Sequence, residues 1–133
     1  KRGHATLPHV FSESQMDEAV ADAMAWFAEL VPALRDADRA KALETGSAIP
    51  RWVDNPVLKR PFFRSLAAFA PLVDAVESLV GRGVDVYFSQ IFFKPPEIGS
   101  PKPAHQDNFY AGPNNPDGLV TAWIAVSYTH LTL

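Results

Sequence analysis

The chain has no cysteine, no long apolar run and no concentration of basic residues. The absence of cysteine excludes disulfides, thiolate metal sites and cysteine nucleophiles. No apolar run approaches the roughly 20 residues that a membrane-spanning helix requires, so we expect no membrane partner. The net charge is −3 and the 12 Lys and Arg residues are scattered, so the electrostatic signature of nucleic-acid binding is missing. Any metal would therefore have to be held by His, Asp, Glu or water.

The composition is sufficient for one globular domain. The chain has 133 residues, of which 47% are hydrophobic and 20% charged, and both fractions are ordinary for a folded protein. The N-terminal stretch KRGHATLPHVF lacks the apolar centre of a secretory signal peptide. We therefore expect a cytoplasmic protein.

The first half of the chain is predicted to be helical. Ser12 or Ser14 can cap a helix, with Gln15 or Asp17 three residues further on as the reciprocal partner. An apolar stripe at helical spacing follows, made of Met16, Val20, Ala23, Phe27, Leu30 and Leu34. Pro32 is expected to interrupt the helix near its end.

Two further helices are predicted after a polar loop at 35–50. Asn55 and Pro56 are suited to begin the first of them. Pro71 can open the second, PLVDAVESLV, and Gly81 and Gly83 then end it.

After Gly83 the pattern is typical of strands. Residues 84–94, VDVYFSQIFFK, are rich in β-branched and aromatic side chains and predict a buried strand. Residues 104–110 (AHQDNFY) and 119–126 (LVTAWIAV) are two further candidates, separated by loops that proline stiffens. Helices followed by antiparallel strands predict an α+β domain with a sandwich or barrel portion.

The triplet His105-Gln106-Asp107 suggests metal chemistry. On an extended strand His105 and Asp107 would share a face, with Cα atoms roughly 6.5 to 7 Å apart. An imidazole and a carboxylate at this spacing can reach one ion, and non-haem Fe(II) oxygenases use such a pair with a distant second His. So short a motif also arises by chance, so a structural pair is the competing interpretation.

The context of the triplet is more specific than the triplet itself. Residues 92–125 contain, in order, Lys94-Pro95-Pro96, Gly99-Ser100-Pro101, His105-Gln106-Asp107 and the run from Asp117 to Ala125. This order and spacing resemble the phytanoyl-CoA dioxygenase family of Fe(II)- and 2-oxoglutarate-dependent oxygenases. The upstream segments HATLPHVF and PLVDAVESLVG also resemble the family, so the resemblance covers most of residues 3–126.

The resemblance implies an enzyme that hydroxylates a small organic substrate, with Fe(II), 2-oxoglutarate and O2 as cofactor and cosubstrates. It makes His105 and Asp107 iron ligands and catalytic residues, and it places Gln90 and Trp123 at the 2-oxoglutarate pocket. Alternatives stay open: Gln90 could bond to nearby backbone, and Trp123 could be a core residue. Iron halogenases of the superfamily replace the carboxylate ligand with a small residue, so Asp107 favours hydroxylation.

The resemblance also implies residues that are expected downstream. The family's second iron-binding His and the basic residue that pairs with 2-oxoglutarate normally lie far beyond the triplet, and His130 is too close to serve. Codons for VSYTHL can match a transposase-end adaptor of sequencing libraries, so residues 127–133 are predicted to be a non-native tail.

The expected organisation is therefore an inactive fragment. Residues 1–126 would be the N-terminal part of one dioxygenase-like domain, with the first strands of a double-stranded β-helix (jelly roll) that needs about eight. The competing function is a non-catalytic jelly-roll binding protein, in which His105 and Asp107 are structural or hold a non-redox metal. The sequence indicates neither the substrate nor the oligomeric state.

Overall fold

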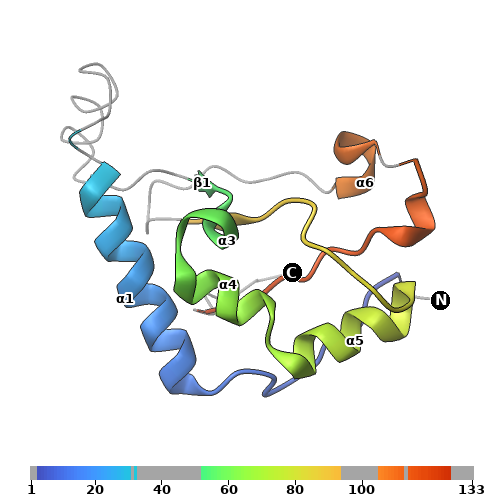
Figure 1. Cartoon of the computed structure of the whole chain (residues 1–133), viewed down its shortest axis with the longest axis horizontal. Helices are drawn as coiled ribbons and strands as arrows, with labels where there is room; N and C mark the ends of the chain where they lie inside the picture. Colours follow the sequence, from blue (N-terminus) through green and yellow to red (C-terminus); the bar gives the residue numbers. More distant parts are fainter. Residues whose placement is uncertain (1–2, 31, 33–51, 94–104, 113, 127–133) are drawn as a thin grey trace, which may run out of the picture.

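The computed structural model describes residues 3–30, 32, 52–93, 105–112 and 114–126. These residues form α1 (Glu13–Leu30), β1 (Trp52–Asp54), α3 (Pro56–Lys59), α4 (Pro61–Ala67), α5 (Ala70–Val80), β2 (Gln90–Phe92), α6 (Asp107–Ala111) and the 3-10 helix η2 (Pro116–Gly118). Figure 1 shows α1 along one side, α3 and α4 beside it, and α5 and α6 on the far side. The fold class is α+β, as predicted. None of the described helices is both long enough and apolar enough to cross a membrane.

Helix α1 begins where the sequence predicts. The backbone N–H of Ser12 donates to Gln15 Oε1 (2.9 Å), and the backbone N–H of Gln15 donates to Ser12 Oγ (3.2 Å). This reciprocal pair is a capping box, which satisfies N–H groups that the first helical turn leaves unpaired. The helix ends at Leu30, two residues before Pro32, in keeping with the missing N–H of proline. The predicted loop at 35–50 lies outside the described residues.

The buried face of α1 differs in part from the predicted stripe. Ala23 and Phe27 are buried as expected, together with Ala19 and Trp26, but Val20 is 45% exposed. A period of 3.6 residues allows several overlapping apolar stripes on a helix this rich in alanine. The sheet packs against the stripe that contains the two large rings, and this choice moves Val20 out of the core.

Prolines and a glycine set the bounds of the middle helices. Helix α3 starts at Pro56 after Asn55, as predicted, but the Asn55 side chain makes no capping hydrogen bond. Helix α5 carries Pro71 in its first turn and ends at Gly81, whose φ of 95° is strained for residues with a Cβ. The predicted stop at this glycine is confirmed.

The sheet contains two short antiparallel strands. Its register pairs Trp52 with Phe92, Val53 with Ile91 and Asp54 with Gln90. The predicted strand at 84–94 is therefore too long, because within the described chain only Gln90–Phe92 has a partner strand. Strand β1 was not predicted, since three residues are too few to show a periodicity.

The other two strand predictions are wrong for the described residues. Residues 107–111 form helix α6 in place of a strand at 104–110, and Gly112 follows it with φ of 54°. Asp and Asn are depleted in strands and favoured in turns and at helix starts. Residues 119–126 are extended at Leu119 but do not join the described sheet. The jelly roll therefore stays a prediction.

The core lies where α1 packs against the sheet. Phe27 is 1% exposed, and its ring meets that of Phe93 edge-on, with centroids 6.0 Å apart. The buried members of this cluster are Ala23, Trp26, Phe27 and Val53, and Leu30, Phe63, Ile91 and Phe93 pack against them. The cluster fixes β2, the strand that carries Gln90, against α1.

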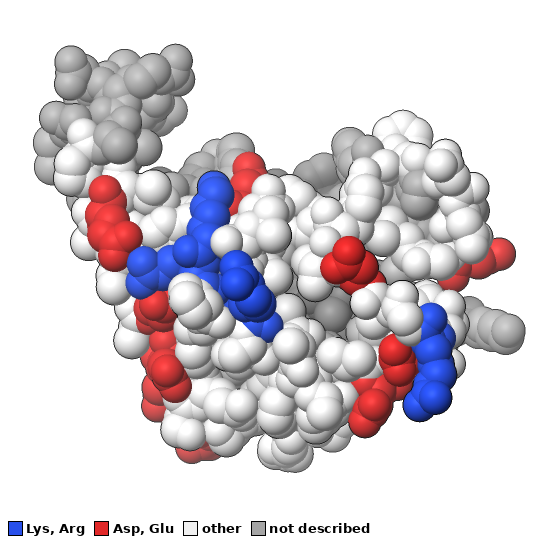
Figure 2. Space-filling model, viewed as in Figure 1, with Lys and Arg blue, Asp and Glu red and all other residues white. Residues whose placement is uncertain are grey.

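A polar contact also joins α1 to the middle helices. Arg60, between α3 and α4, donates to Asp22 through Nη2 (2.6 Å) and Nε (3.2 Å), and to Glu29 through Nη1 (3.1 Å). Figure 2 shows acidic side chains along α1 beside basic ones over α3 and α4. The hydrogen bond to Asp22, followed by that to Glu29, raises the pKa of Arg60 above its ordinary value. The guanidinium therefore stays charged, and its fork suits a carboxylate.

Candidate metal centre

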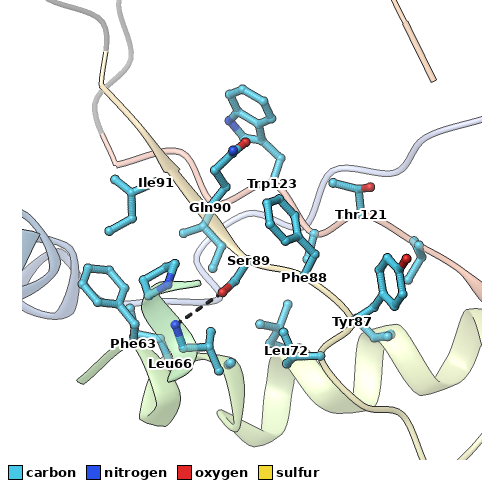
Figure 3. A pocket seen from close by; sticks show the side chains of 18 of the residues that line it. Phe63, Leu66, Leu72, Tyr87, Phe88, Ser89, Gln90, Ile91, Thr121 and Trp123 are labelled. Atoms are coloured by element: carbon cyan, nitrogen blue, oxygen red, sulfur yellow. Dashed lines mark hydrogen bonds between the residues drawn. The ribbon is translucent and has the colours of Figure 1, made fainter. Parts of the chain in front are cut away.

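A wide hollow of about 1770 Å³ contains all four predicted site residues on its wall. These residues are His105, Asp107, Gln90 and Trp123. Helices α1, α3, α4 and α5 contribute mostly apolar side chains to the lining, and further lining residues come from the chain segments 80–93, 105–111 and 118–126. Figure 3 shows the side chains of Gln90 and Trp123 on one side of the segment that carries β2, and those of Phe63 and Leu66 on the other side.

His105 and Asp107 lie together at one part of this wall. His105 Nε2 is 3.3 Å from Asp107 Oδ1, and the two side chains are 30% and 48% exposed. Asp107 opens helix α6, and the backbone N–H of Phe109 donates to the carbonyl of Gln106 (3.1 Å). The predicted pairing is thus present, but a turn produces it, and not the alternation of a strand.

The separation of the two donor atoms fits a shared metal ion. Nitrogen and oxygen donors about 2.1 Å from an octahedral ion lie about 3.0 Å apart when they occupy neighbouring positions. The observed 3.3 Å is close to this value. It also suits an ion pair between an imidazolium and a carboxylate, which is the structural alternative. Among the described residues, no group of three His, Cys, Asp or Glu side chains is placed to hold a metal.

The second carboxylate oxygen of Asp107 has its own partner. Thr121 Oγ1 donates to Asp107 Oδ2 at 2.7 Å. Thr121 was not among the predicted site residues, although a hydroxyl within the apolar run LVTAWIAV was a usable signal.

Tyr87 is a further contact that the sequence analysis missed. Its hydroxyl donates to the backbone carbonyl of Ala111 (3.3 Å). This carbonyl is in the last turn of α6, where intrahelical partners are lacking. The bond links the segment before β2 to the helix that carries Asp107, and no local pattern in the sequence indicates it.

Gln90 bonds to a side chain on the neighbouring strand. Its Nε2 donates to Asp54 Oδ1 at 2.6 Å, across the register of the sheet. This partner is a carboxylate and not the backbone group that the sequence analysis considered. A glutamine amide has two N–H donors, and the bond to Asp54 uses one of them.

Trp123 is 77% exposed and is therefore not a core residue of the described structure. Its indole stacks on the ring of Phe92, with centroids 6.1 Å apart and planes 7° from parallel. The stack places a broad aromatic surface on the wall of the hollow.

The match to known families agrees with this arrangement. The family model for phytanoyl-CoA dioxygenase (PhyH) matches residues 1–131. The chain belongs to the phytanoyl-CoA dioxygenase family. Proteins of this family are generally Fe(II)- and 2-oxoglutarate-dependent oxygenases, so the resemblance carried by the triplet and its flanking motifs is confirmed. No curated protein and no solved structure matches the chain significantly.

For a phytanoyl-CoA dioxygenase family member, the four predicted positions fall into two groups. His105 and Asp107 are in contact, and their role as iron ligands stays a prediction. Gln90 and Trp123 line the same hollow, where Gln90 donates a hydrogen bond to Asp54 and Trp123 stacks on Phe92. Their roles toward 2-oxoglutarate stay predictions.

Proposed function

We propose that the chain is the N-terminal part of a dioxygenase that uses Fe(II) and 2-oxoglutarate to hydroxylate a small organic substrate. The observation that carries the proposal is the 3.3 Å pairing of His105 Nε2 with Asp107 Oδ1 on the wall of an apolar hollow. Membership of the phytanoyl-CoA dioxygenase family supports it. When bound, Fe(II) with 2-oxoglutarate and O2 supplies the oxidising chemistry, and the protein supplies binding and orientation.

The residues of this chain would divide the work between them. His105 would bind the ion through Nε2 and Asp107 through Oδ1, each filling one position. Trp123 would offer a flat apolar wall to the carbon chain of 2-oxoglutarate, and Gln90 an N–H donor to one of its carboxylates. The apolar part of the lining would accommodate the apolar part of the substrate.

The proposal also includes the organisation and location of the protein. Residues 1–126 would form part of a jelly-roll dioxygenase domain in the cytoplasm, and residues 127–133 would be a non-native tail. Sequencing the source DNA through codon 126 tests the tail. A natural reading frame that encodes SYTHLTL would contradict the proposal that residues 127–133 are non-native.

Calorimetric titration of 2-oxoglutarate into the protein encoded by the complete source gene, with and without Mn²⁺ as an oxygen-stable substitute for Fe(II), tests the function. We expect 2-oxoglutarate binding to require the metal. We also expect His105→Ala and Asp107→Ala each to weaken this binding at least about tenfold. The matched controls are His4→Ala and Asp17→Ala, which change exposed residues away from the hollow. Binding without metal, absence of binding, or equal binding in site and control variants would contradict the proposal.

The second candidate is a non-catalytic binding protein with a structural or non-redox His–Asp pair. The observation in its favour is that the described residues offer two metal-binding side chains and no third. Such a protein would bind Mn²⁺ equally well with and without 2-oxoglutarate. The same titration therefore separates the two functions.

A further inference from the structure

The carboxylate of Asp107 divides its two oxygens between different partners. Oδ1 lies 3.3 Å from His105 Nε2, and Oδ2 accepts a 2.7 Å hydrogen bond from Thr121 Oγ1. We propose that Thr121 is a positioning residue, which fixes the Asp107 carboxylate so that it binds the metal through Oδ1 alone. This inference rests on the proposed function, and it adds a residue outside the His-Gln-Asp triplet.

The hydrogen bond has a clear consequence for the carboxylate. The terminal torsion of an aspartate is broad and roughly two-fold, so its oxygens exchange places easily unless something holds them. Carboxylates also bind metals through one oxygen or through both. A hydroxyl fixed on Oδ2 selects one rotamer and keeps that oxygen from the ion. Partners of this kind orient metal ligands and commonly affect affinity.

Thr121 is itself well placed to act as a fixed donor. A β-branched side chain has few χ1 rotamers, so the position of its hydroxyl oxygen varies little. Its segment is anchored two residues later, where Trp123 stacks on Phe92. On the other side, Tyr87 holds the end of α6, the helix that Asp107 opens. The contact therefore joins two supported segments.

A purely structural bond between α6 and residues 119–126 is the alternative. Such a bond would affect stability but not the affinity for metal in the folded state. A metal titration on folded variants separates the two roles, and the serine variant shows whether the hydroxyl is the group that matters.

The experiment is a Co²⁺ titration of the protein encoded by the complete source gene, in the presence of 2-oxoglutarate, followed by the visible absorption of the bound ion. Thr121→Val removes the hydroxyl at nearly constant shape, and we expect Co²⁺ affinity to fall about 10- to 100-fold. Thr121→Ser keeps the hydroxyl, and its affinity is expected within about threefold of the original protein. The control is Thr6→Val, at an exposed threonine outside the hollow. Circular dichroism identifies the folded variants, and Thr121→Ala replaces Thr121→Val if the latter does not fold.

Asp107→Ala separates failure of this inference from failure of the proposed function. If Asp107→Ala weakens Co²⁺ binding and Thr121→Val does not, the inference is overturned and the function stands. The inference is also overturned if Thr121→Ser loses as much affinity as Thr121→Val, because packing would then explain the effect. If Asp107→Ala binds Co²⁺ like the original protein, or the original protein binds none, the proposed function fails and the inference with it.

Discussion

Replacing Phe27 with alanine tests whether α1 and the sheet share one core. The ring is 1% exposed and contacts the edge of Phe93, which directly follows β2. Removing a buried phenylalanine ring forfeits its transfer free energy and leaves a cavity, at a cost of about 3–5 kcal/mol. A domain is typically stable by about 5–15 kcal/mol, so this loss is a large part of the total.

Urea denaturation followed by tryptophan fluorescence measures the loss. Trp26, next to Phe27 in the sequence, is 5% exposed, so its emission reports on this core. With a denaturant dependence of about 2 kcal/mol per molar urea, a loss of about 4 kcal/mol lowers the midpoint by about 2 M. The matched control is Leu79→Ala on α5, because Leu79 is 65% exposed. A surface change of this kind is expected to stay within about 0.5 kcal/mol.

Three results would refute the reasoning. The first is a loss of less than about 1 kcal/mol in the free energy of unfolding for Phe27→Ala, because removing a buried phenylalanine ring costs more than this. The second is an equal effect of Leu79→Ala. The third is an original chain that unfolds without a cooperative transition. Each would mean that α1 does not hold the strand that carries Gln90, and the wall of the hollow would need another support.

Two further predictions concern the ends and the attachment of α1. Ser12→Ala removes one half of the capping box, so we expect a loss of about 1 kcal/mol in the free energy of unfolding; an unchanged urea midpoint would show that the helix start does not depend on the box. Arg60→Met removes the hydrogen bonds to Asp22 and Glu29, so we expect a lower urea midpoint than for the control Arg82→Met at an exposed site. Because Glu29 is 61% exposed, added salt should screen its ion pair with Arg60 and reduce the difference in urea midpoint between the two Arg variants. A difference that does not change with salt would mean that packing, and not charge, accounts for it.

Helices α1, α3 and α5 could be predicted because short-range chemistry sets their ends, whereas α4 and α6 were not predicted. Ser12 and Gln15 are three residues apart, so the capping box that they form is a local contact. Gly81 ends α5 because its φ of 95° disfavours any residue with a Cβ. The family could be predicted because its motifs are contiguous stretches of residues in a fixed order, and the match over residues 1–131 confirms it.

The strands and the contacts of the site depended on tertiary structure. A strand exists only where a second backbone pairs with it. Strand β1 has three residues that pair with β2, so β2 is only three residues long. For the same reason residues 107–111 could form a helix where apolar and aromatic neighbours suggested a strand.

The sequence by itself determined the start of α1, the start of α3, the stop of α5 at Gly81 and the family. Only the tertiary structure decided that Thr121 donates to Asp107 from 14 residues away, and that Gln90 donates to Asp54 from 36 residues away. Both are hydrogen bonds between segments that are distant in the chain. No local propensity encodes such a contact, because its free energy is gained only after the chain has brought the two segments together.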